Sequence, residues 1–290
     1  MDIQLLTAFV TIAQLGSFSA AAQRLHLTQS AISKRIALLE VQVTQPLFDR
    51  VGRSVQLTEA GLALVPRAKR ILQEIEDTQQ FMNDIRGRVS GPLRIATSHH
   101  IGLHRLPPLL KTFSEQYPEV HLQLTFIDSE QAINAILQGE FELALITLPK
   151  TTLDNTADNI QRHHLWQDPM EFVVNNNHPL SFKQIIRLGD LAAYPAILPD
   201  RNTYTTELIQ QLFTQEKQLL NISMTTNHLD AIKMMISVGL GWSVLPETLL
   251  GDHVTRLDVA GLKLTRQLGC IHHRARTLSN AARTMLEHLR

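Results

Sequence analysis

The chain has 290 residues, of which 44% are hydrophobic and 19% are charged, and its 27 basic side chains are balanced by 27 acidic ones. This length supports two domains with cores of their own, and the composition is typical of a soluble globular protein. The single cysteine excludes an intrachain disulfide and a cysteine-rich zinc site, and the sequence contains neither a long apolar run nor a basic, cleavable leader, so we expect a cytoplasmic protein with no membrane partner.

Two helices are predicted before residue 28. The first spans residues 2–15 and ends at Gly16, because glycine readily adopts the left-handed conformation that closes a helix. The second is expected over residues 20–25, with Ser19 as its N-cap. Residues 26–27 then form a tight turn, so the segment leads directly into a third helix.

The third helix, from Thr28 to about residue 43, has the amphipathic pattern that suits a DNA groove. Thr28 is the expected N-cap, since its hydroxyl can accept an amide hydrogen of the first turn. One face is an apolar stripe, and the other is small and polar with one cation, so nothing bulky would obstruct a groove. An ordinary amphipathic helix with a solvated face is the alternative. The stripe is Ile32, Ile36, Leu39 and Val43, and the polar face is Ser30, Ser33, Lys34 and Ala37.

Residues 47–57 predict two short strands around Gly52, with two arginines at the tip. A hairpin of this kind beside a helix-turn-helix is typical of a wing that reaches phosphates or a minor groove. Residues 1–70 contain eight basic and four acidic side chains, which gives +4 and leaves −4 for the rest of the chain. The candidate DNA contacts are Gln29 and Ser33 for base edges, Thr28, Ser30 and Lys34 for the major groove, Arg35 and Arg50 for phosphates, and Arg53 for phosphates or the minor groove.

Residues 59–88 predict a single long helix capped by Thr58. At 1.5 Å per residue this helix is about 45 Å long. It carries a heptad-like seam that a glutamine interrupts, and a bend is expected at Pro66, which removes a backbone hydrogen bond. Apolar side chains along one face of a long helix must be buried against something, so we expect a second copy of the chain there, in a homodimer or homotetramer. Packing of the helix on its own domain is the alternative. The seam is Val65, Ala68, Leu72, Ile75, Gln79 and Met82.

Beyond a hinge at residues 90–92, strands and helices alternate. This order predicts parallel sheets covered by helices. Two such runs and a returning C-terminus predict two α/β lobes that form a clamp. The expected strands are residues 93–97, 120–128, 142–146, 171–174, 196–198, 222–226, 241–245 and 268–271, and the expected helices are 106–116, 129–138 (capped by Ser129), 203–219, 229–238 and 279–289.

Three strand ends carry polar side chains beside helix N-termini, where ligands bind in open α/β sheets. Free backbone amides, hydroxyls and imidazoles together favour a small anion, either a carboxylate or an inorganic oxyanion. Ser98 is the leading candidate, and a helix cap without a ligand is the alternative for each residue. The candidates are Thr97, Ser98, His99, His100 and Ile101 after the first strand, Thr203 after the strand at 196–198, and Asn227 after the strand at 222–226.

The histidines and the cysteine permit two further interpretations, which we do not favour. His100 and His104 are four residues apart, a spacing that can hold zinc on a helix, but no neighbouring residue supplies a third ligand. Cys270 lies in an apolar strand without a second cysteine, so we expect a buried structural thiol. No metal, no cofactor and no catalytic residue is therefore expected.

At this point the sequence resembles a known family, the LysR-type transcriptional regulators. The resemblance is specific in the first 61 residues, and weaker marks continue to the C-terminus. It implies a largely α-helical winged helix-turn-helix over residues 1–58, a dimerising linker helix over 59–89, and an α/β effector domain of periplasmic-binding-protein type over 90–290. The matching residues are Phe9, Gly16, Ser17, Ala20, Ala21, Leu25, Thr28, Gln29, Ser30, Ala31, Ser33, Ile36, Leu39, Glu40, Leu47, Phe48, Arg50, Leu57, Thr58, Ala60 and Gly61.

The resemblance also implies that residues 92–162 and 267–290 form one lobe, that residues 163–266 form the other, and that the effector cleft lies at the three junctions described above. The expected function is sequence-specific DNA binding controlled by a small effector. The implied partners are double-stranded DNA, the effector and a second copy of the chain, and RNA polymerase is a further candidate. The alternatives are an enzyme or solute-binding protein of the same fold, which would need a catalytic constellation or an export signal, and an architectural DNA binder, which would need no clamp.

Overall fold

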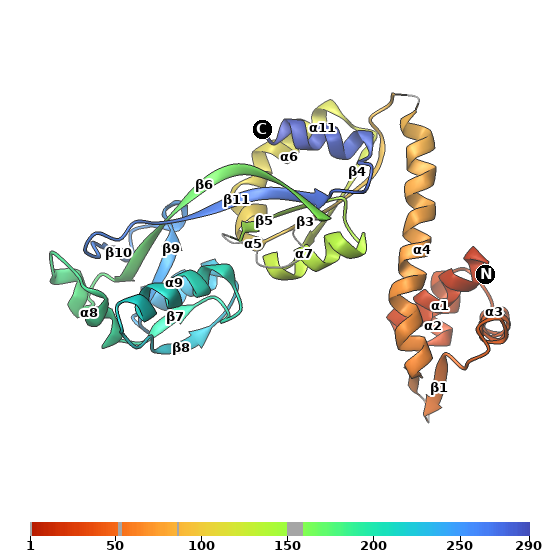
Figure 1. Ribbon diagram of the computed structural model, residues 1–290, viewed down its shortest axis with the longest axis horizontal. Coiled ribbons are helices and arrows are strands. Elements are labelled where there is room, and N and C mark those ends of the chain that lie inside the picture. Colours follow the sequence, from red (N-terminus) through yellow and green to blue (C-terminus); the bar gives the residue numbers. More distant parts are fainter. Residues whose placement is uncertain (1, 52–53, 86, 150–158) are drawn as a thin grey trace. The chain divides into compact units, whose positions relative to one another are not determined.

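A computed structural model describes residues 2–51, 54–85, 87–149 and 159–290 (Figure 1). The chain divides into two compact units, an N-terminal unit that ends at Arg88 and a C-terminal unit that begins at Val89. Each unit has hydrophobic core clusters of its own. None of the helices in the described ranges has the length and apolar character needed to cross a bilayer.

The N-terminal unit begins with three helices, α1 (Ile3–Leu15), α2 (Phe18–Arg24) and α3 (Gln29–Val43). Gly16 ends α1 with a φ of 61°, as predicted. The prediction for α2 was wrong by two residues: Ser17, not Ser19, is the N-cap, because the Ser17 hydroxyl accepts the amide hydrogen of Ala20. Thr28 caps α3 as predicted, accepting from the Ala31 amide.

The three helices share a core with the wing, which consists of β1 (Phe48–Val51) and β2 (Ser54–Leu57). The carboxylate of Glu40 accepts the amide hydrogen of Leu47 at 2.7 Å and so ties α3 to the start of the wing. The apolar stripe of α3 faces inward, as the sequence predicted. The largest fully buried side chains of this core are Leu6, Phe9, Ile12, Ile32, Leu39 and Leu47.

The long helix α4 (Glu59–Asp84) ends four residues earlier than predicted and continues through Pro66 without interruption. Thr58 caps it by accepting from the Gly61 amide. Gly61 is required there, because a Cβ atom on it would lie 2.2 Å from the carbonyl oxygen of Leu47. The bend at Pro66 stays a prediction.

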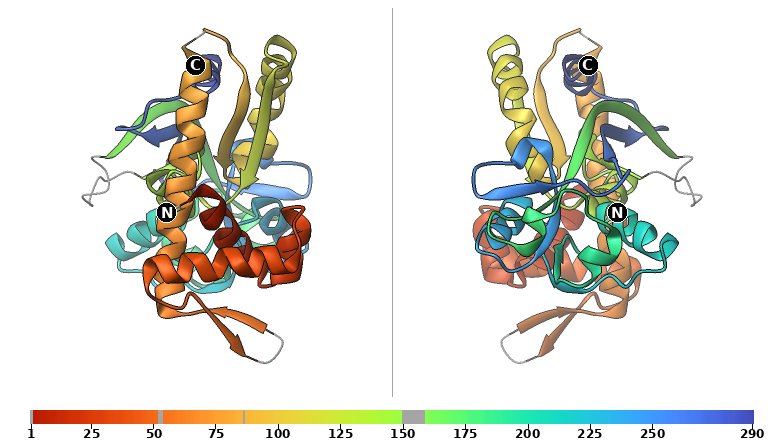
Figure 2. Two further views of the ribbon diagram at one scale, coloured as in Figure 1. Left: turned by 90° about the vertical axis from the view of Figure 1, so that its right-hand side faces the viewer. Right: turned by 90° about the vertical axis from the view of Figure 1, so that its left-hand side faces the viewer.

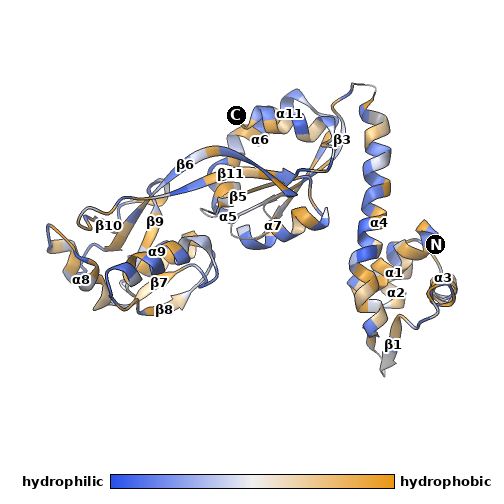
Figure 3. Ribbon diagram, viewed as in Figure 1, coloured by the Kyte–Doolittle hydropathy of each residue, from blue (hydrophilic) through white to orange (hydrophobic). Residues whose placement is uncertain are grey.

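Part of the predicted seam on α4 packs on its own domain. Ala68 is fully buried, and Val65 and Leu72 pack beside it against the core of the helix-turn-helix. The alternative interpretation therefore holds for this part of the helix. Apolar and polar residues alternate along the ribbon of α4 (Figure 3). The exposed large apolar side chains of α4 are Leu62, Ile71, Phe81 and Met82, and Ile85, just after the helix, is also exposed.

The C-terminal unit is built on one mixed sheet with the strand order β4-β3-β5-β11-β6-β9-β7-β8. Lobe I contains the parallel strands β3 (Gly91–Thr97), β4 (Val120–Phe126) and β5 (Leu143–Leu148). The core clusters place α5, α6 and α11 on one face of these strands and α7 on the other. The bounds of these helices are His99–His104, Leu106–Gln116, Asn280–His288 and Ser129–Gln138 for α5, α6, α11 and α7.

Lobe II repeats this layered arrangement with β7 (Ala196–Leu198), β8 (Ile222–Thr225) and β9 (Trp242–Pro246), in which β7 is parallel to both neighbours. Helices α8 and α9 cover one face, and α10 covers the other. The remaining bounds are Leu188–Ala192 for α8, Tyr204–Gln215 for α9, Leu229–Ser237 for α10, Pro179–Phe182 and Glu247–Leu249 for the 3₁₀ turns η2 and η3, and Val254–Leu257 for β10.

Two long strands join the lobes, β6 (Ile160–Asn175) and β11 (Leu264–His273) (Figures 1 and 2). The two strands are antiparallel to each other, β11 is also antiparallel to β5, and β6 is also antiparallel to β9. The sheet is therefore mixed, whereas the sequence predicted parallel strands. The predicted strand at 171–174 is only the end of β6, whose first half is polar and is defined by its pairing with β11. The predicted lobe boundaries fall inside these two strands and stay predictions.

Ser129 does not cap α7 but belongs to its first turn. Its hydroxyl accepts the amide hydrogen of Thr147 at 3.0 Å, so it ties the helix to β5. The local sequence is the same whether a serine caps a helix or binds a neighbouring strand, so only the tertiary packing shows which role Ser129 has.

Candidate functional site

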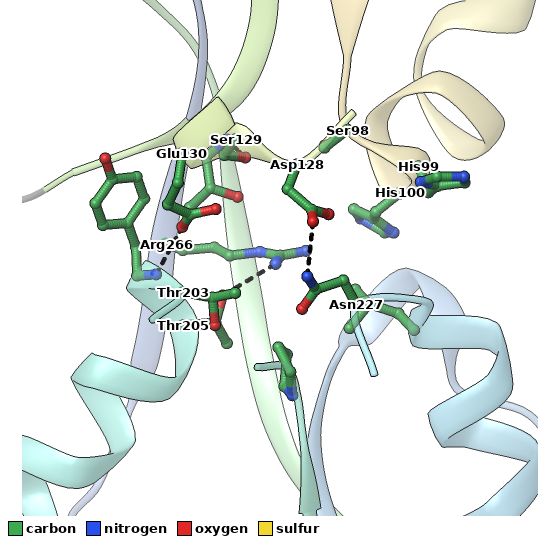
Figure 4. Close-up of a pocket in the computed structure, with 14 residues that line it drawn as sticks. Ser98, His99, His100, Asp128, Ser129, Glu130, Thr203, Thr205, Asn227 and Arg266 are labelled. Carbon is green, nitrogen blue, oxygen red and sulfur yellow. Dashed lines mark hydrogen bonds between the residues drawn. The ribbon is translucent and has the colours of Figure 1, made fainter. Parts of the chain in front are cut away.

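A pocket of about 60 Å³ lies between the two lobes (Figure 4). It is formed where the strands of lobe I end, at the start of α9, at the residues before α10 and on β11. Figure 4 shows the Arg266 side chain in the middle of the pocket, with the lobe I residues on one side and the lobe II residues on the other. The lining residues are Ser98, His99, His100, Asp128, Ser129, Glu130, Thr147, Pro199, Thr203, Tyr204, Thr205, Asn227, Leu229 and Arg266.

The structure brings five of the seven sequence-derived effector candidates together in this pocket: Ser98, His99, His100, Thr203 and Asn227. The other two, Thr97 and Ile101, are fully buried and do not line the pocket. Ile101 belongs to the core of lobe I, because the inward face of α5 must cover the sheet.

Ser98 and Thr203 both precede helices, but their hydroxyls differ in what they bind. The Thr203 hydroxyl caps α9 by accepting from the Thr206 amide, and it donates to the carbonyl of Asp200 at 2.8 Å. The Ser98 hydroxyl makes no capping hydrogen bond to α5. Ser98 therefore has the hydroxyl that is more available to a ligand, while Thr203 already serves as a helix cap.

Sequence reasoning missed the central residue of the pocket, Arg266 on β11. Its side chain is buried, with Nε 2.7 Å from the Asp168 carboxylate and Nη1 donating to the Thr205 hydroxyl at 3.3 Å. Its Nη2 atom is also buried and has no hydrogen-bond partner among the described residues. Buried donors are nearly always paired, so an unpaired guanidinium nitrogen in a pocket favours an anionic ligand. The neighbours of Arg266 in the sequence, Thr265 and Gln267, are polar, so nothing local indicates that this arginine is buried.

Asp168 lies beneath the pocket and is completely buried. Two guanidinium groups contact it, since Arg105 approaches at 3.2 Å in addition to Arg266. The His100 Nε2 atom lies 3.6 Å from the same carboxylate. Burial by itself raises the pKa of a carboxylate, but His100 and Arg266 outweigh it and lower the pKa of Asp168 to about 2. One carboxylate thus faces two cations, which leaves a net positive charge under the pocket.

Two histidines that line the pocket, His99 and His100, have pKa values below the usual value for histidine. Burial lowers the pKa of His100, and burial together with the nearby His228 lowers the pKa of His99. The rings of His99 and His228 are 4.3 Å apart and come from opposite lobes. The imidazoles of His99 and His100 therefore contribute hydrogen-bonding groups rather than charge at neutral pH.

Acidic side chains of lobe I reach across to lobe II on the other side of the pocket. The Asp128 carboxylate accepts from the side-chain amide of Asn227 at 2.8 Å, and the Glu130 carboxylate accepts from the backbone amide of Tyr204 at 3.0 Å. Burial raises the pKa of Glu130. Because Tyr204 is the first residue of α9, Glu130 occupies one of the amides that a helix N-terminus would offer to an anion. These two contacts hold the lobes together.

A second, more open cavity of about 430 Å³ adjoins the pocket. The two share His99, Asp128 and Asn227. The larger cavity also includes Phe126, His228 and Asp200, so it offers an aromatic wall next to the polar pocket.

The predicted DNA contacts are mostly exposed on the N-terminal unit. Thr28, Gln29, Ser30 and Lys34 are exposed at the start of α3, and Ser33 is partly exposed. The outcome differs for the three arginines: Arg35 donates to the Gln4 side chain at 2.7 Å and so ties α3 to α1, Arg50 pairs with Val55 in the wing, and Arg53 lies outside the described residues.

The remaining histidines and the cysteine form no metal site in the described part of the chain, where no group of three or more histidine, cysteine or acidic side chains is placed to hold an ion. His163 and His272 approach within 3.1 Å through their Nε2 atoms, but no third ligand joins them there. Cys270 is fully buried, and burial raises the pKa of its thiol to about 12. A thiol in this state is unreactive, which fits the structural role expected for it.

Two family models match the chain, one in each part of it. Residues 3–62 match "Bacterial regulatory helix-turn-helix protein, lysR family", and residues 86–290 match "LysR substrate binding domain". Among curated relatives, the activator CmpR of Synechocystis is 30% identical over 97% of this chain and 92% of its own length. An uncharacterised regulator of Azotobacter vinelandii is 63% identical over 37% of this chain and 75% of its own length.

A solved structure supports the fold over the whole length. The LysR-family regulator CbnR in complex with its target DNA superimposes with a TM-score of 0.72, at 22% identity, covering 100% of this chain and 99% of that one. At this identity the likeness establishes the fold, with an N-terminal helix-turn-helix followed by a two-lobed α/β domain.

Proposed function

The chain belongs to the LysR family of DNA-binding transcriptional regulators, and from this premise we propose that a small anionic effector bound between its two lobes controls how the winged helix-turn-helix binds DNA. Its relatives are regulators rather than enzymes. The proposed domains are residues 1–58 for DNA binding, 59–89 for the linker and 90–290 for the effector. Such a regulator works where the chromosome lies, in the cytoplasm, and RNA polymerase is a candidate contact.

One observation supports an anionic effector above the others, the unpaired Nη2 atom of the buried Arg266. The Ser98 hydroxyl, which makes no capping hydrogen bond to α5, lines the same pocket, and the Arg105–Asp168–Arg266 group beneath it carries net positive charge. A carboxylate or inorganic oxyanion would satisfy the guanidinium by a charge-assisted hydrogen bond. Because groups of both lobes line the pocket, an anion there would bias the clamp toward the closed state.

Ser98→Ala is expected to keep DNA binding and lose most of the response to the effector. The substitution removes one hydroxyl from the pocket and leaves the N-terminal unit untouched. The readout is thermal shift of the full chain in a panel of sulfate, phosphate and small carboxylates, followed by titration of the best binder. Ser237→Ala, which removes a hydroxyl from the exposed end of α10, is the matched control and should bind as the wild type does. Equal affinity in wild type and Ser98→Ala would mean that the effector binds elsewhere.

We further propose that α4 dimerises through its exposed apolar side chains rather than through the Val65–Leu72 part of the predicted seam. Ile71 and Met82 on α4 are 41% and 59% exposed, and Ile85, directly after the last residue of the helix, is 64% exposed. A charge at the centre of this stripe would be buried unpaired in a dimer, which is strongly unfavourable. LysR regulators form oligomers, so a second copy of the chain is the natural cover.

Met82→Asp is therefore expected to give monomers that still fold, whereas Met82→Leu should assemble as the wild type does. Sedimentation velocity measures the oligomer, and circular dichroism checks the fold. If Met82→Asp sediments as the wild type while folded, this stripe is not the main contact between subunits.

A further inference from the structure

The pocket has two sides of opposite charge. On one side lies the guanidinium of Arg266, a residue only 8% exposed, whose Nη2 atom has no partner among the described residues. His100, 5% exposed, also lines the pocket, and neither of its ring nitrogens has a hydrogen-bond partner there. The Nη2 donor of Arg266 on this side is satisfied only when an acceptor group, such as a carboxylate, accepts its hydrogen bond.

The other side has carboxylates without a cation. Asp128 and Asp200 both accept from the same neutral amide, that of Asn227, at 2.8 and 3.2 Å. Neither carboxylate lies within 4.0 Å of a lysine or arginine nitrogen in the part of the chain that the structure describes. Asp128 lines both the pocket and the adjoining cavity, and Asp200 lines the cavity.

A simple anion would satisfy only the first side. Placed against Arg266, it would lie in the same small pocket as the Asp128 carboxylate, and like charges at a few Å repel strongly where water is excluded. A positive group on the ligand removes this repulsion and also gives Asp128 the counter-charge that the protein does not supply. The observed hydrogen bonds from Asn227 can remain while a cation approaches, because a carboxylate accepts several hydrogen bonds.

We propose that the ligand is a zwitterion of the amino-acid class, with its carboxylate on Arg266 and Ser98 and its ammonium on Asp128. Its side chain extends into the adjoining cavity of about 430 Å³, where Phe126 and the His99–His228 pair form the wall. This inference rests on the proposed function, since it specifies the ligand of the same pocket. It differs from a general anion site by requiring both charges on one small molecule.

The test is titration calorimetry on the full chain. The standard amino acids are screened by thermal shift, and the tightest binder is compared with two matched probes, the same molecule without its amino group and the same molecule without its carboxylate. Each probe is expected to bind at least about tenfold more weakly than the amino acid, because each lacks one of the two charges. If the deaminated acid binds as tightly as the amino acid, or if no amino acid binds at about 10 mM, the zwitterion is overturned.

Two variants separate this inference from the proposed function. Asp128→Asn keeps an oxygen that can accept from Asn227 but removes the charge, so the amino acid and its deaminated acid should then bind alike. Asp252→Asn makes the same change at an exposed position outside the pocket and should leave the preference intact. If a carboxylate without an ammonium binds best and Ser98→Ala weakens it, the zwitterion fails while the effector pocket stands. If Ser98→Ala and Asp128→Asn both leave ligand affinity unchanged, both proposals fail.

Discussion

Asp168→Ala is expected to destabilise the C-terminal unit by about 3–5 kcal/mol, the cost of leaving buried cations without their counter-charge. Arg266 and Arg105 both depend on this carboxylate, and Asp168, a residue of β6, is itself completely buried. The loss of stability is measured by urea unfolding of the full chain, monitored through a spectroscopic signal that arises in the C-terminal unit. Because the guanidinium of Arg266 would also lose its orientation, effector binding should fall with stability.

The control for this prediction is Asp190→Ala, which removes an aspartate from an exposed ion pair with Lys183. The Asp190 carboxylate also accepts the amide hydrogen of Arg187 at the start of α8. An exposed ion pair contributes less than about 1 kcal/mol and a helix-capping side chain about 0.5–2 kcal/mol, so this variant should lose less stability than Asp168→Ala. If Asp168→Ala is no less stable than Asp190→Ala, the Asp168 carboxylate is not the counter-charge on which Arg105 and Arg266 depend.

The lowered pKa of Asp168 gives the same group a signature in acid. Its pKa falls from 3.8 to about 2 on folding, so its charged form stabilises the folded state by about 2 kcal/mol above pH 4. As the pH falls below about 4, the unfolded state binds a proton at Asp168 while the folded state does not, so the free energy of unfolding decreases. The contribution is lost once the pH reaches about 2, where the folded protein is protonated as well. In Asp168→Ala this part of the acid dependence should be absent.

Gln29→Ala is expected to weaken binding to the specific DNA site by about 1–3 kcal/mol and to flatten base preference, the effect typical of losing a base contact in the major groove. Gln29 is exposed at the first turn of α3, and its side-chain oxygen accepts a hydrogen bond from the Ser19 hydroxyl at 3.3 Å. The specific site is obtained by selection from random duplexes, and affinities for it and for random DNA are measured by fluorescence anisotropy.

Lys34→Ala is the matched variant on the same helix. As a phosphate contact, Lys34 should contribute equally to specific and random DNA, and its loss should reduce the salt slope by roughly one. If Gln29→Ala and Lys34→Ala lose specificity to the same degree, the division between a base-reading and a phosphate-binding residue is wrong.

The local parts of this fold could be predicted from the sequence because short-range chemistry determines them. Thr28 and Thr58 cap helices as predicted, and Gly16 ends α1, since each choice depends on a few neighbouring backbone groups. The apolar stripe of α3 is equally local. The error at Ser17 and Ser19 arises because two serines two residues apart are both acceptable caps, and only the packing of α2 on α1 and α3 selects between them.

The centre of the pocket could not be predicted, because it depends on register between distant strands. Arg266 and Asp168 are directly opposite each other on β11 and β6, 98 residues apart in the chain. The first half of β6 is polar and has no alternating pattern, so neither the strand nor its register is visible in the sequence. Glu130 is similar: its contact with Tyr204 exists only because the two lobes face each other.

The seam of α4 marks a different limit. Its heptad pattern indicated that one face is covered, and this was correct, but a pattern does not say by what. Ala68 and Leu72 are covered by the chain's own helix-turn-helix, while Met82 is exposed. Periodicity alone cannot distinguish packing on the chain's own domain from packing on a second subunit, since both need apolar side chains at the same spacing.

The most direct test of the account is calorimetric titration of the tightest small ligand into the full chain, free and bound to its specific DNA. If the cleft controls DNA binding, the two ligand affinities differ, by about 5–150-fold for a typical coupling of 1–3 kcal/mol, and the ligand changes the DNA affinity by the same factor. Ser98→Ala should abolish the ligand signal and leave the DNA affinity at its ligand-free value. Identical ligand affinities with and without DNA would contradict control of DNA binding by the cleft.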